Sequence, residues 1–120
     1  MTITQDINAI AETIRKTIPA EKIYLFGSYA YGTPNQDSDY DFFIVVPDGV
    51  MRPIEAMRQA QRALARRKRS VSIDILAATR SDFEQMRQKV NAIEKQVDQK
   101  GVLLYERQGR SLQMDEPGAQ

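Results

Sequence analysis

Segments with helical periodicity alternate with short apolar runs along this chain, and that order restricts the fold to one α/β domain with a small sheet. The first helical segment carries an isoleucine stripe at intervals of three and four residues, made up of Ile3, Ile7, Ile10, Ile14 and Ile18. Thr2 and Gln5 have the spacing of a capping box, and Pro19 ends the segment. We therefore expect an N-terminal amphipathic helix.

The apolar runs predict strands over residues 22–26, 41–46 and 71–77, with a short edge strand over residues 102–105. Apolar and polar residues alternate in the third run, with Val71, Ile73 and Ile75 on one face. Asp74 shares the opposite face with Ser72 and Leu76. A carboxylate is thus expected within an otherwise apolar strand.

Two further helices are expected between these strands. Pro53 opens one of them, and Ile54, Met57 and Leu64 are expected on its inner side, together with several alanines that allow close packing. Ser81 and Glu84 have capping-box spacing for the other. Its apolar stripe consists of Phe83, Met86, Val90, Ile93 and Val97. Gly101 then has the position of a helix C-cap.

The chain has 120 residues, 42% of them hydrophobic, which suits one compact domain. We expect this domain to span residues 1–106, because the polar residues 107–120 have the composition of a flexible tail. No apolar run approaches the roughly 20 residues needed to span a bilayer, and no secretory signal is evident. The expected location is therefore cytoplasmic, with no membrane association.

The residues that are missing restrict the chemistry. The absence of Cys excludes disulfides, thiol nucleophiles and cysteine-bound zinc, and the absence of His excludes Ser-His-Asp triads and imidazole acid–base catalysis. Any catalysis must use carboxylates, hydroxyls, Lys or Arg, with a hard metal as the expected cofactor.

Gly27 and Ser28 directly follow the first predicted strand. Glycine allows the backbone to approach a ligand closely, and a helix that begins at Ser28 would present free N–H groups and a hydroxyl to a phosphate. An ordinary turn is the alternative for this dipeptide taken alone.

Three aspartates form the second feature. Asp39 and Asp41 are two residues apart at the start of a predicted strand, so that their carboxylates face the same side. Asp74 would join them if its strand lay beside theirs, and three converging carboxylates would suit two Mg²⁺ ions and phosphoryl transfer. The alternatives are a solvated acidic loop for the pair and a salt bridge to a nearby arginine for Asp74.

Other ligand-binding motifs do not fit. The aspartates from Asp37 onward resemble the start of an EF-hand loop, but its sixth position is Phe42 and its twelfth is Asp48. The chain contains no Walker A motif and no GxGxxG.

Gly27-Ser28 is followed by ten residues and then by Asp39-x-Asp41, and Asp74 lies on the next predicted strand. In this spacing the chain resembles the polymerase-β-type nucleotidyltransferase superfamily. The resemblance covers about residues 20 to 105. It implies a nucleotidyltransferase fold of α/β (α+β) class, in which helices flank a small mixed sheet.

The same resemblance implies roles for individual residues. Gly27 and Ser28 would bind the triphosphate of ATP, while Asp39, Asp41 and Asp74 would be catalytic and hold two Mg²⁺ ions. Asp74 would also complete the site for the attacking hydroxyl. The family transfers a nucleoside monophosphate from a nucleoside triphosphate to a hydroxyl and releases pyrophosphate.

In size the chain is similar to minimal nucleotidyltransferases (MNT), the antitoxins paired with HEPN-domain toxins. This implies transfer of AMP from ATP to a tyrosine of a HEPN RNase toxin. Two alternatives stay open: a non-catalytic module that neutralises or regulates a partner by binding it, and an enzyme that modifies a small molecule such as an antibiotic.

Residues 56–73 contain no acidic residue but six basic ones, namely Arg58, Arg62, Arg66, Arg67, Lys68 and Arg69. Arg58, Arg62 and Arg66 are spaced by four and line one helix face. This cluster is either a solvated helix face or a docking surface for an acidic partner or RNA. Because aromatic residues are not interleaved with the cations, direct sequence-selective RNA binding is not expected.

Overall fold

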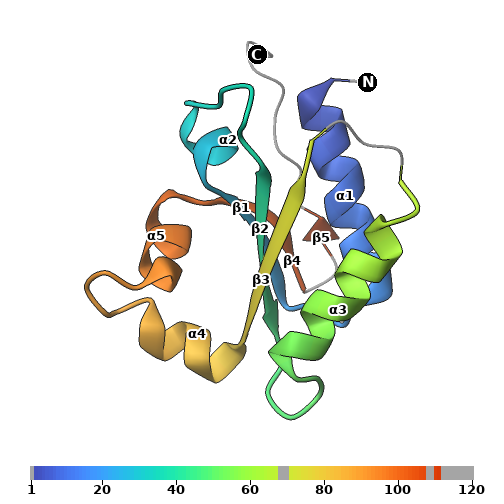
Figure 1. The fold of residues 1–120 in the computed structure, drawn as a ribbon. Helices are drawn as coiled ribbons and strands as arrows, with labels where there is room; N and C mark the ends of the chain where they lie inside the picture. Colours follow the sequence, from blue (N-terminus) through green and yellow to red (C-terminus); the bar gives the residue numbers. More distant parts are fainter. Residues whose placement is uncertain (1, 68–70, 108–109, 112–120) are drawn as a thin grey trace.

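The computed structural model describes residues 2–67, 71–107 and 110–111. Figure 1 shows the order of the elements. The helices are α1 (Ile3–Thr17), α2 (Ser28–Tyr31), α3 (Pro53–Leu64), α4 (Arg80–Met86) and α5 (Ile93–Lys100). The strands are β1 (Lys22–Phe26), β2 (Tyr40–Val46), β3 (Ile73–Thr79), β4 (Val102–Glu106) and β5 (Arg110–Ser111).

The strands form one mixed sheet in the order β3-β2-β1-β4-β5. β1 pairs antiparallel with both β2 and β4, whereas β2 and β3 run parallel and are connected through α3. This confirms the predicted α/β class and mixed sheet. β4 is not the edge strand that was predicted, because β5 pairs with its outer side.

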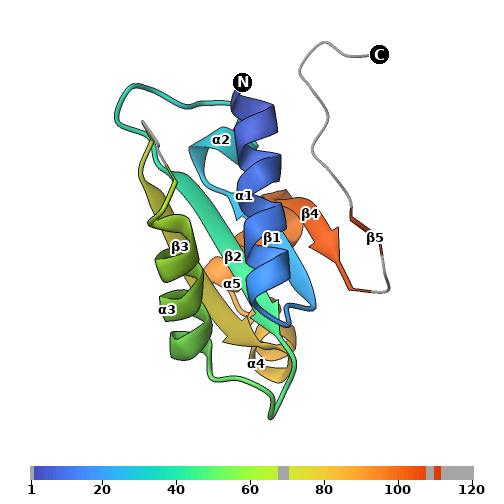
Figure 2. The same cartoon turned by 90° about the vertical axis from the view of Figure 1, so that its right-hand side faces the viewer.

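Helices cover both faces of the sheet. α1 and α3 lie on one face, and α4 and α5 lie on the other (Figure 1). Figure 2 shows α1 and α3 toward the viewer, in front of the strands. The larger core cluster lies under α1 and α3 and includes Ile10, Leu25 and Phe42. A smaller cluster, which includes Tyr24, Phe43 and Phe83, lies on the other face. The sheet is therefore the middle layer of three.

α1 confirms the N-terminal prediction. The Thr2 side chain accepts a hydrogen bond from the Gln5 backbone N–H at 3.0 Å, and the Gln5 side chain accepts one from the Thr2 N–H at 2.9 Å. Ile7, Ile10 and Ile14 are fully buried against the sheet. The predicted stripe thus forms most of the helix's inner face.

The inner face of α3 differs from the prediction. Its buried residues are Ala56, Ala60 and Leu64, spaced by four, while Ile54 is 39% exposed and Met57 lies at the margin of the core. Small alanine side chains let the helix lie close to β2 and β3, as predicted, and Leu64 is buried with them. The departure from the predicted inner face is Ile54.

The predicted single helix after residue 81 is wrong. α4 begins at Arg80 with Thr79 as its N-cap, and Asn91, whose φ is 71°, lies in the turn before α5. Val90 is 76% exposed, whereas Phe83 and Val97 both enter the smaller core cluster. In one continuous helix these two residues would lie about 21 Å apart, so the turn allows both to pack on the same part of the sheet.

The third strand covers residues 73–79 rather than 71–77. Its parallel register with β2 runs from the pair Tyr40 and Ile73 to the pair Val46 and Thr79. Ser81 does not cap a helix, because its backbone N–H and its hydroxyl both donate hydrogen bonds to the carboxylate of Asp48. Pairing along the full length of β2 therefore shifts both strand β3 and the start of α4.

Gly101 is confirmed as the C-cap of α5, but its φ is −72° and not left-handed. A Cβ at this position would lie 3.1 Å from the Leu25 carbonyl oxygen, so glycine is needed there for a close approach of the chain to β1.

The domain boundary at residue 106 stays a prediction. β5 adds Arg110 and Ser111 to the sheet, and residues 112–120 of the predicted tail lie outside the described part of the chain. In the described ranges, no helix has the length and apolar character needed to cross a membrane.

Candidate functional site

The site is built where β2 and β3 begin. Asp41 and Asp74 are in register on these two parallel strands, and Phe26 of β1 pairs with Asp41 on the other side. Asp39 directly precedes β2, and the next residue, Tyr40, donates its backbone N–H to the Ser72 carbonyl oxygen at 2.9 Å. The strand register therefore brings together the three aspartates predicted from the sequence.

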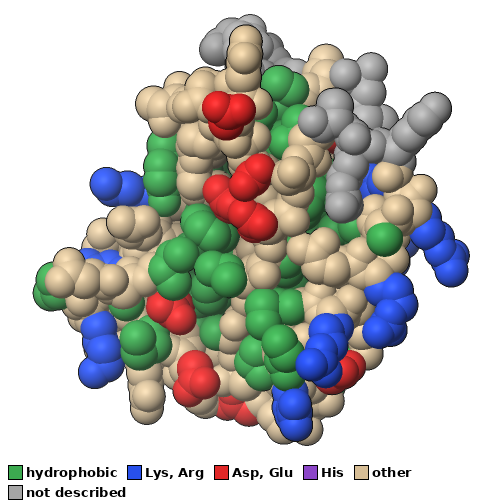
Figure 3. Space-filling model, viewed as in Figure 1, with side chains coloured by type: hydrophobic (Ala, Val, Ile, Leu, Met, Phe, Trp, Pro, Cys, Tyr) green, Lys and Arg blue, Asp and Glu red, His purple; other side chains and the backbone are tan. Residues whose placement is uncertain are grey.

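The three carboxylates lie on the sheet face that α4 and α5 cover farther along. Asp41 shares a strand face with Phe43, whose ring centroid lies 5.5 Å from that of Phe83 in α4. The two helices do not reach the start of the strands. Asp74 is exposed, and Leu76, two residues farther on, is 38% exposed. Figure 3 shows acidic side chains gathered near the centre of this open face.

The carboxylates perturb one another. Partial burial raises the pKa of Asp41 from 3.8 to about 6, and the charges of Asp74 and Asp39 and a hydrogen bond with Asp74 add to this effect. The pKa of Asp74 is also raised, by desolvation and then by a hydrogen bond with Asp39 and the charge of Asp39. The Asp74 carboxyl therefore lies within hydrogen-bond reach of both Asp39 and Asp41, and the charged carboxylates repel one another.

Gly27 connects the carboxylates to the turn after β1. It adopts φ 77° and ψ −163°, a region open almost only to glycine, and a Cβ here would overlap Oδ2 of Asp41. Its carbonyl oxygen accepts hydrogen bonds from the N–H groups of Ala30 and Tyr31, both at 3.0 Å. Ser28 therefore begins α2 directly beside Asp41, as the sequence predicted.

These residues fit a divalent cation by their chemistry. Carboxylates are hard oxygen ligands, and a cation between Asp39, Asp41 and Asp74 would relieve the repulsion that, after desolvation, raises the pKa values of Asp41 and Asp74. Among the described residues, no group of three or more acidic side chains is arranged so that it could hold a metal ion by itself. Mg²⁺ commonly keeps waters and substrate phosphates as ligands, so a complete protein cage is not required.

A half-buried polar cluster, not predicted from the sequence, holds the start of β2 from the other face. Asp6 of α1 accepts a hydrogen bond from Arg67, which follows α3, with N and O 2.5 Å apart. Burial raises the pKa of Tyr40 to about 12, and the charge of Asp6 and a hydrogen bond with it contribute further. The Tyr40 ring also packs against Tyr29 of α2, with centroids 4.8 Å apart. Tyr40 therefore links α1, α2 and the residue between Asp39 and Asp41.

Tyr40→Phe is expected to lower the free energy of unfolding by about 1 to 2 kcal/mol, because it removes a hydrogen bond to a charged carboxylate while keeping the ring. Urea unfolding measures this change. Tyr24→Phe is the matched control, since burial is the main cause of the raised pKa of Tyr24, and it should cost about 0.5 kcal/mol or less. Equal losses in the two variants would show that the hydrogen bond with Asp6 does not stabilise the protein.

The raised pKa of Asp41 predicts that the metal-free protein becomes more stable as the pH falls from about 7 to about 4. In this range the folded state, with a pKa of about 6, binds more protons than the unfolded state, with 3.8. Stability is therefore lost as pH rises through the folded pKa. Asp41→Asn should raise the free energy of unfolding at neutral pH by about 1 to 2 kcal/mol, allowing for partial solvent screening.

Urea unfolding over this pH range, in the absence of divalent cations, tests the effect. Asp41→Asn should flatten the pH dependence, whereas Asp37→Asn, in the exposed loop before β2, should leave it unchanged. The same pH dependence in wild type and Asp41→Asn would contradict the close approach of the carboxylates.

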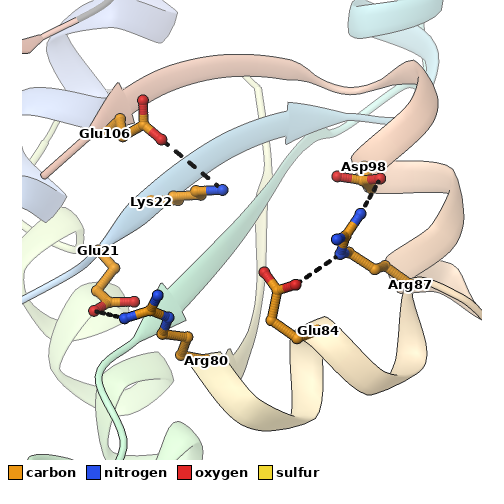
Figure 4. Close-up of polar contacts among 7 residues, drawn as sticks. All are labelled: Glu21, Lys22, Arg80, Glu84, Arg87, Asp98 and Glu106. Atoms are coloured by element: carbon orange, nitrogen blue, oxygen red, sulfur yellow. Dashed lines mark hydrogen bonds and ion pairs between the residues drawn. The ribbon is translucent and has the colours of Figure 1, made fainter.

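A cavity of about 280 Å³ lies at the opposite end of the sheet, next to the first residues of β1 and the last residues of β2 and β4. Most of its charged groups are already paired (Figure 4): Lys22 with Glu106 at 3.9 Å, Arg80 with Glu21 at 3.7 Å, and Glu84 with Arg87 at 3.0 Å. The pair of Lys22 and Glu106 joins β1 to β4, and the pair of Arg80 and Glu21 joins α4 to the residue before β1. The raised pKa values identify the carboxylate end as the candidate site.

Not all of the predicted basic cluster is free. Arg67 pairs with Asp6, and Arg58 lies 3.5 Å from Glu55. Lys68 and Arg69 lie outside the described residues. The described cations of the cluster without an ion pair are Arg62 on α3 and Arg66 in the turn after it. Because α3 ends at Leu64, the prediction that Arg58, Arg62 and Arg66 line one helix face is wrong for Arg66.

Solved structures with the same fold include a candidate nucleotidyltransferase from Sulfolobus solfataricus. It aligns with a TM-score of 0.62 at 20% identity and covers 92% of this chain and 86% of that one. A toxin–antitoxin with AMP-PNP aligns with a TM-score of 0.55 at 26% identity, covering 84% of this chain and 73% of that one. A mutant of the toxin–antitoxin MntA-HpeT aligns with a TM-score of 0.54 at 25% identity and the same coverage. Comparison with curated proteins gave no match.

The family model "Polymerase beta, Nucleotidyltransferase" matches residues 8–110. This range extends from α1 to β5 and contains Gly27, Ser28 and the three aspartates at the start of β2 and β3. With most of the sequence matched and the fold shared with solved relatives, the chain belongs to the polymerase β nucleotidyltransferase family.

Proposed function

We propose that this chain transfers AMP from ATP to a hydroxyl of a partner protein. The observation that carries the proposal is the convergence of Asp39, Asp41 and Asp74 on an open sheet face, within a chain of this family. Because the chain contains no His and no Cys, carboxylates are its best-suited groups for binding metals and accepting a proton.

The proposed reaction is a direct displacement at phosphorus. The acceptor oxygen forms a bond to the α-phosphorus of ATP, the bond between this phosphorus and the oxygen that bridges to the β-phosphorus breaks, and pyrophosphate leaves with the electron pair. Asp74 is exposed beside Asp41 and has a raised pKa, which suits it to accept the hydroxyl proton. Bound Mg²⁺ supplies neutralisation of the charge that develops on the attacking and leaving oxygens.

The proposed role of each site residue follows from the element on which it lies. Asp39 and Asp41, at the start of β2, would hold two Mg²⁺ ions together with Asp74 of β3. Gly27 and Ser28 would bind the triphosphate, because the missing Cβ of Gly27 lets the turn after β1 lie against Asp41. The triphosphate would then lie between α2 and the carboxylates.

The proposed partner is a HEPN-domain toxin, which makes the chain an antitoxin that modifies a toxin tyrosine. Support comes from the likeness to toxin–antitoxin structures at 25 and 26% identity. One of those structures holds AMP-PNP, an analogue of ATP, which supports ATP as the nucleotide donor here.

Intact-mass measurement tests this proposal. A purified HEPN-domain toxin is incubated with the chain, Mg²⁺ and ATP, and in parallel with each of the other nucleoside triphosphates. We expect the partner to gain the mass of AMP with ATP, and to gain none after chelation of Mg²⁺ or with the Asp39→Asn, Asp41→Asn double variant. Neutralisation of the partner without any mass gain would contradict the proposed enzyme activity and show that the chain acts by binding alone.

A further inference from the structure

A groove of about 340 Å³ lies between the C-terminal end of α1 and the outer face of α3. It is lined by Thr17, Gln59, Arg62, Ala63 and Arg66. Among the described residues no carboxylate lines it, and the side chains of Gln59, Arg62 and Arg66 can donate hydrogen bonds to a ligand. Ligand clefts in proteins have volumes from about 300 Å³ upward, so this groove is a small one. It has room for a few side chains but not for a folded element. The groove is therefore complementary to anionic groups.

The two guanidinium groups of this groove differ from their neighbours. Arg15 pairs with Glu12 at 2.8 Å, and Arg67 pairs with Asp6 at 2.5 Å. Arg62 near the end of α3 and Arg66 in the turn after it both line the groove, both are exposed, and neither forms an ion pair with any described residue. Two neighbouring cations that have no ion-pair partner in the described part of the chain can both pair with an anion from outside.

The groove is separate from the candidate site. It lies on the α1 and α3 layer, whereas Asp39, Asp41 and Asp74 face the layer of α4 and α5. Figure 3 shows basic side chains at the margin of the molecule over α3, away from the acidic group at the centre. The groove therefore does not serve the triphosphate of the proposed reaction.

We propose that this groove binds an acidic segment of the partner protein, whose carboxylates pair with Arg62 and Arg66. The inference rests on the proposed function in taking the partner to be a protein. Charge complementarity argues for carboxylates, and the lack of aromatic lining argues against RNA, which requires stacking surfaces for its bases. Tyr31, an exposed aromatic residue, lies on α2 and not at the groove.

Fluorescence anisotropy with a short labelled peptide in which Glu and Ser alternate tests the proposal on the full chain without any nucleotide. The wild type should bind this peptide more tightly than the matched peptide with Gln in place of Glu. The Arg62→Ser, Arg66→Ser double variant should bind it about tenfold more weakly, the scale expected for two exposed ion pairs. Gln59→Glu, which adds a negative charge to the groove wall, should weaken binding as well.

The matched control is the Lys89→Ser, Lys100→Ser double variant, which removes the same charge from exposed positions near α4 and α5. It should bind as wild type does. Equal weakening in both double variants would show attraction by net charge alone and overturn the proposal. Tighter binding of an oligouridylate, lost in the Arg62→Ser, Arg66→Ser variant, would overturn it in favour of RNA. Because this assay needs neither ATP nor transfer, its failure is distinguishable from failure of the proposed enzyme.

Discussion

Asp74→Asn is expected to lower the rate of AMP transfer at least about a hundredfold, or roughly 2.7 kcal/mol in the activation barrier, while ATP still binds. Asp39 and Asp41 precede or begin β2 and can hold a metal-bound triphosphate without β3. Asp74 comes from the neighbouring strand and is exposed toward an incoming acceptor. Asparagine keeps its shape but removes the charge needed by the second metal and the ability to accept a proton.

Two measurements separate these effects: intact mass of the partner over time gives transfer, and calorimetric titration with a non-hydrolysable ATP analogue and Mg²⁺ gives binding. Asp37→Asn, an exposed aspartate near the same strand, is the control and should leave both values unchanged. If the wild type transfers no nucleotide and neutralises the partner as well as Asp74→Asn does, the chain acts by binding alone.

Gly27→Ala is expected to abolish nucleotide binding and to lower the free energy of unfolding by about 3 kcal/mol or more, because two costs combine. Its backbone, with φ 77° and ψ −163°, is strained for any residue that has a Cβ. The added methyl group would also occupy the position of the Asp41 carboxylate. Relief of that overlap must move either the turn that begins α2 or the carboxylate that is proposed to bind metal.

Gly49→Ala separates the two costs. Gly49 also has a positive φ, 74°, but nothing lies within 4 Å of the position of its Cβ. This control should lose about 1 to 2 kcal/mol from backbone strain alone and bind nucleotide as wild type does. Urea unfolding and calorimetric titration measure the two properties. Nucleotide binding by Gly27→Ala at wild-type affinity would contradict the close approach of Gly27 and Asp41.

The sequence predicts the carboxylate group well because strand geometry determines it. Side chains two residues apart share a strand face, so Asp39 and Asp41 had to point together once β2 formed. Asp74 joins them because β3 lies parallel to β2 in the register that pairs Asp41 with Asp74. The pairing itself involves residues more than 30 positions apart, and the resemblance rather than the periodicity predicted it.

The helices of the second layer could not be predicted as well because tertiary contacts override local signals. Ser81 has the spacing of an N-cap, yet it donates hydrogen bonds to Asp48, and Thr79 caps α4. The stripe from Phe83 to Val97 has the period of one helix, but packing both residues on the sheet requires the turn at Asn91. The cluster of Asp6, Arg67 and Tyr40 likewise joins residues whose contacts no local pattern reveals.

A crystal structure with a non-hydrolysable ATP analogue and Mn²⁺ in place of Mg²⁺ tests most directly whether the three carboxylates form the catalytic site. We predict anomalous density for metal between Asp39, Asp41 and Asp74, and the triphosphate between this metal and the Gly27-Ser28 turn. Nucleotide bound elsewhere on the chain, with the three carboxylates too far apart to share a metal, would contradict the account.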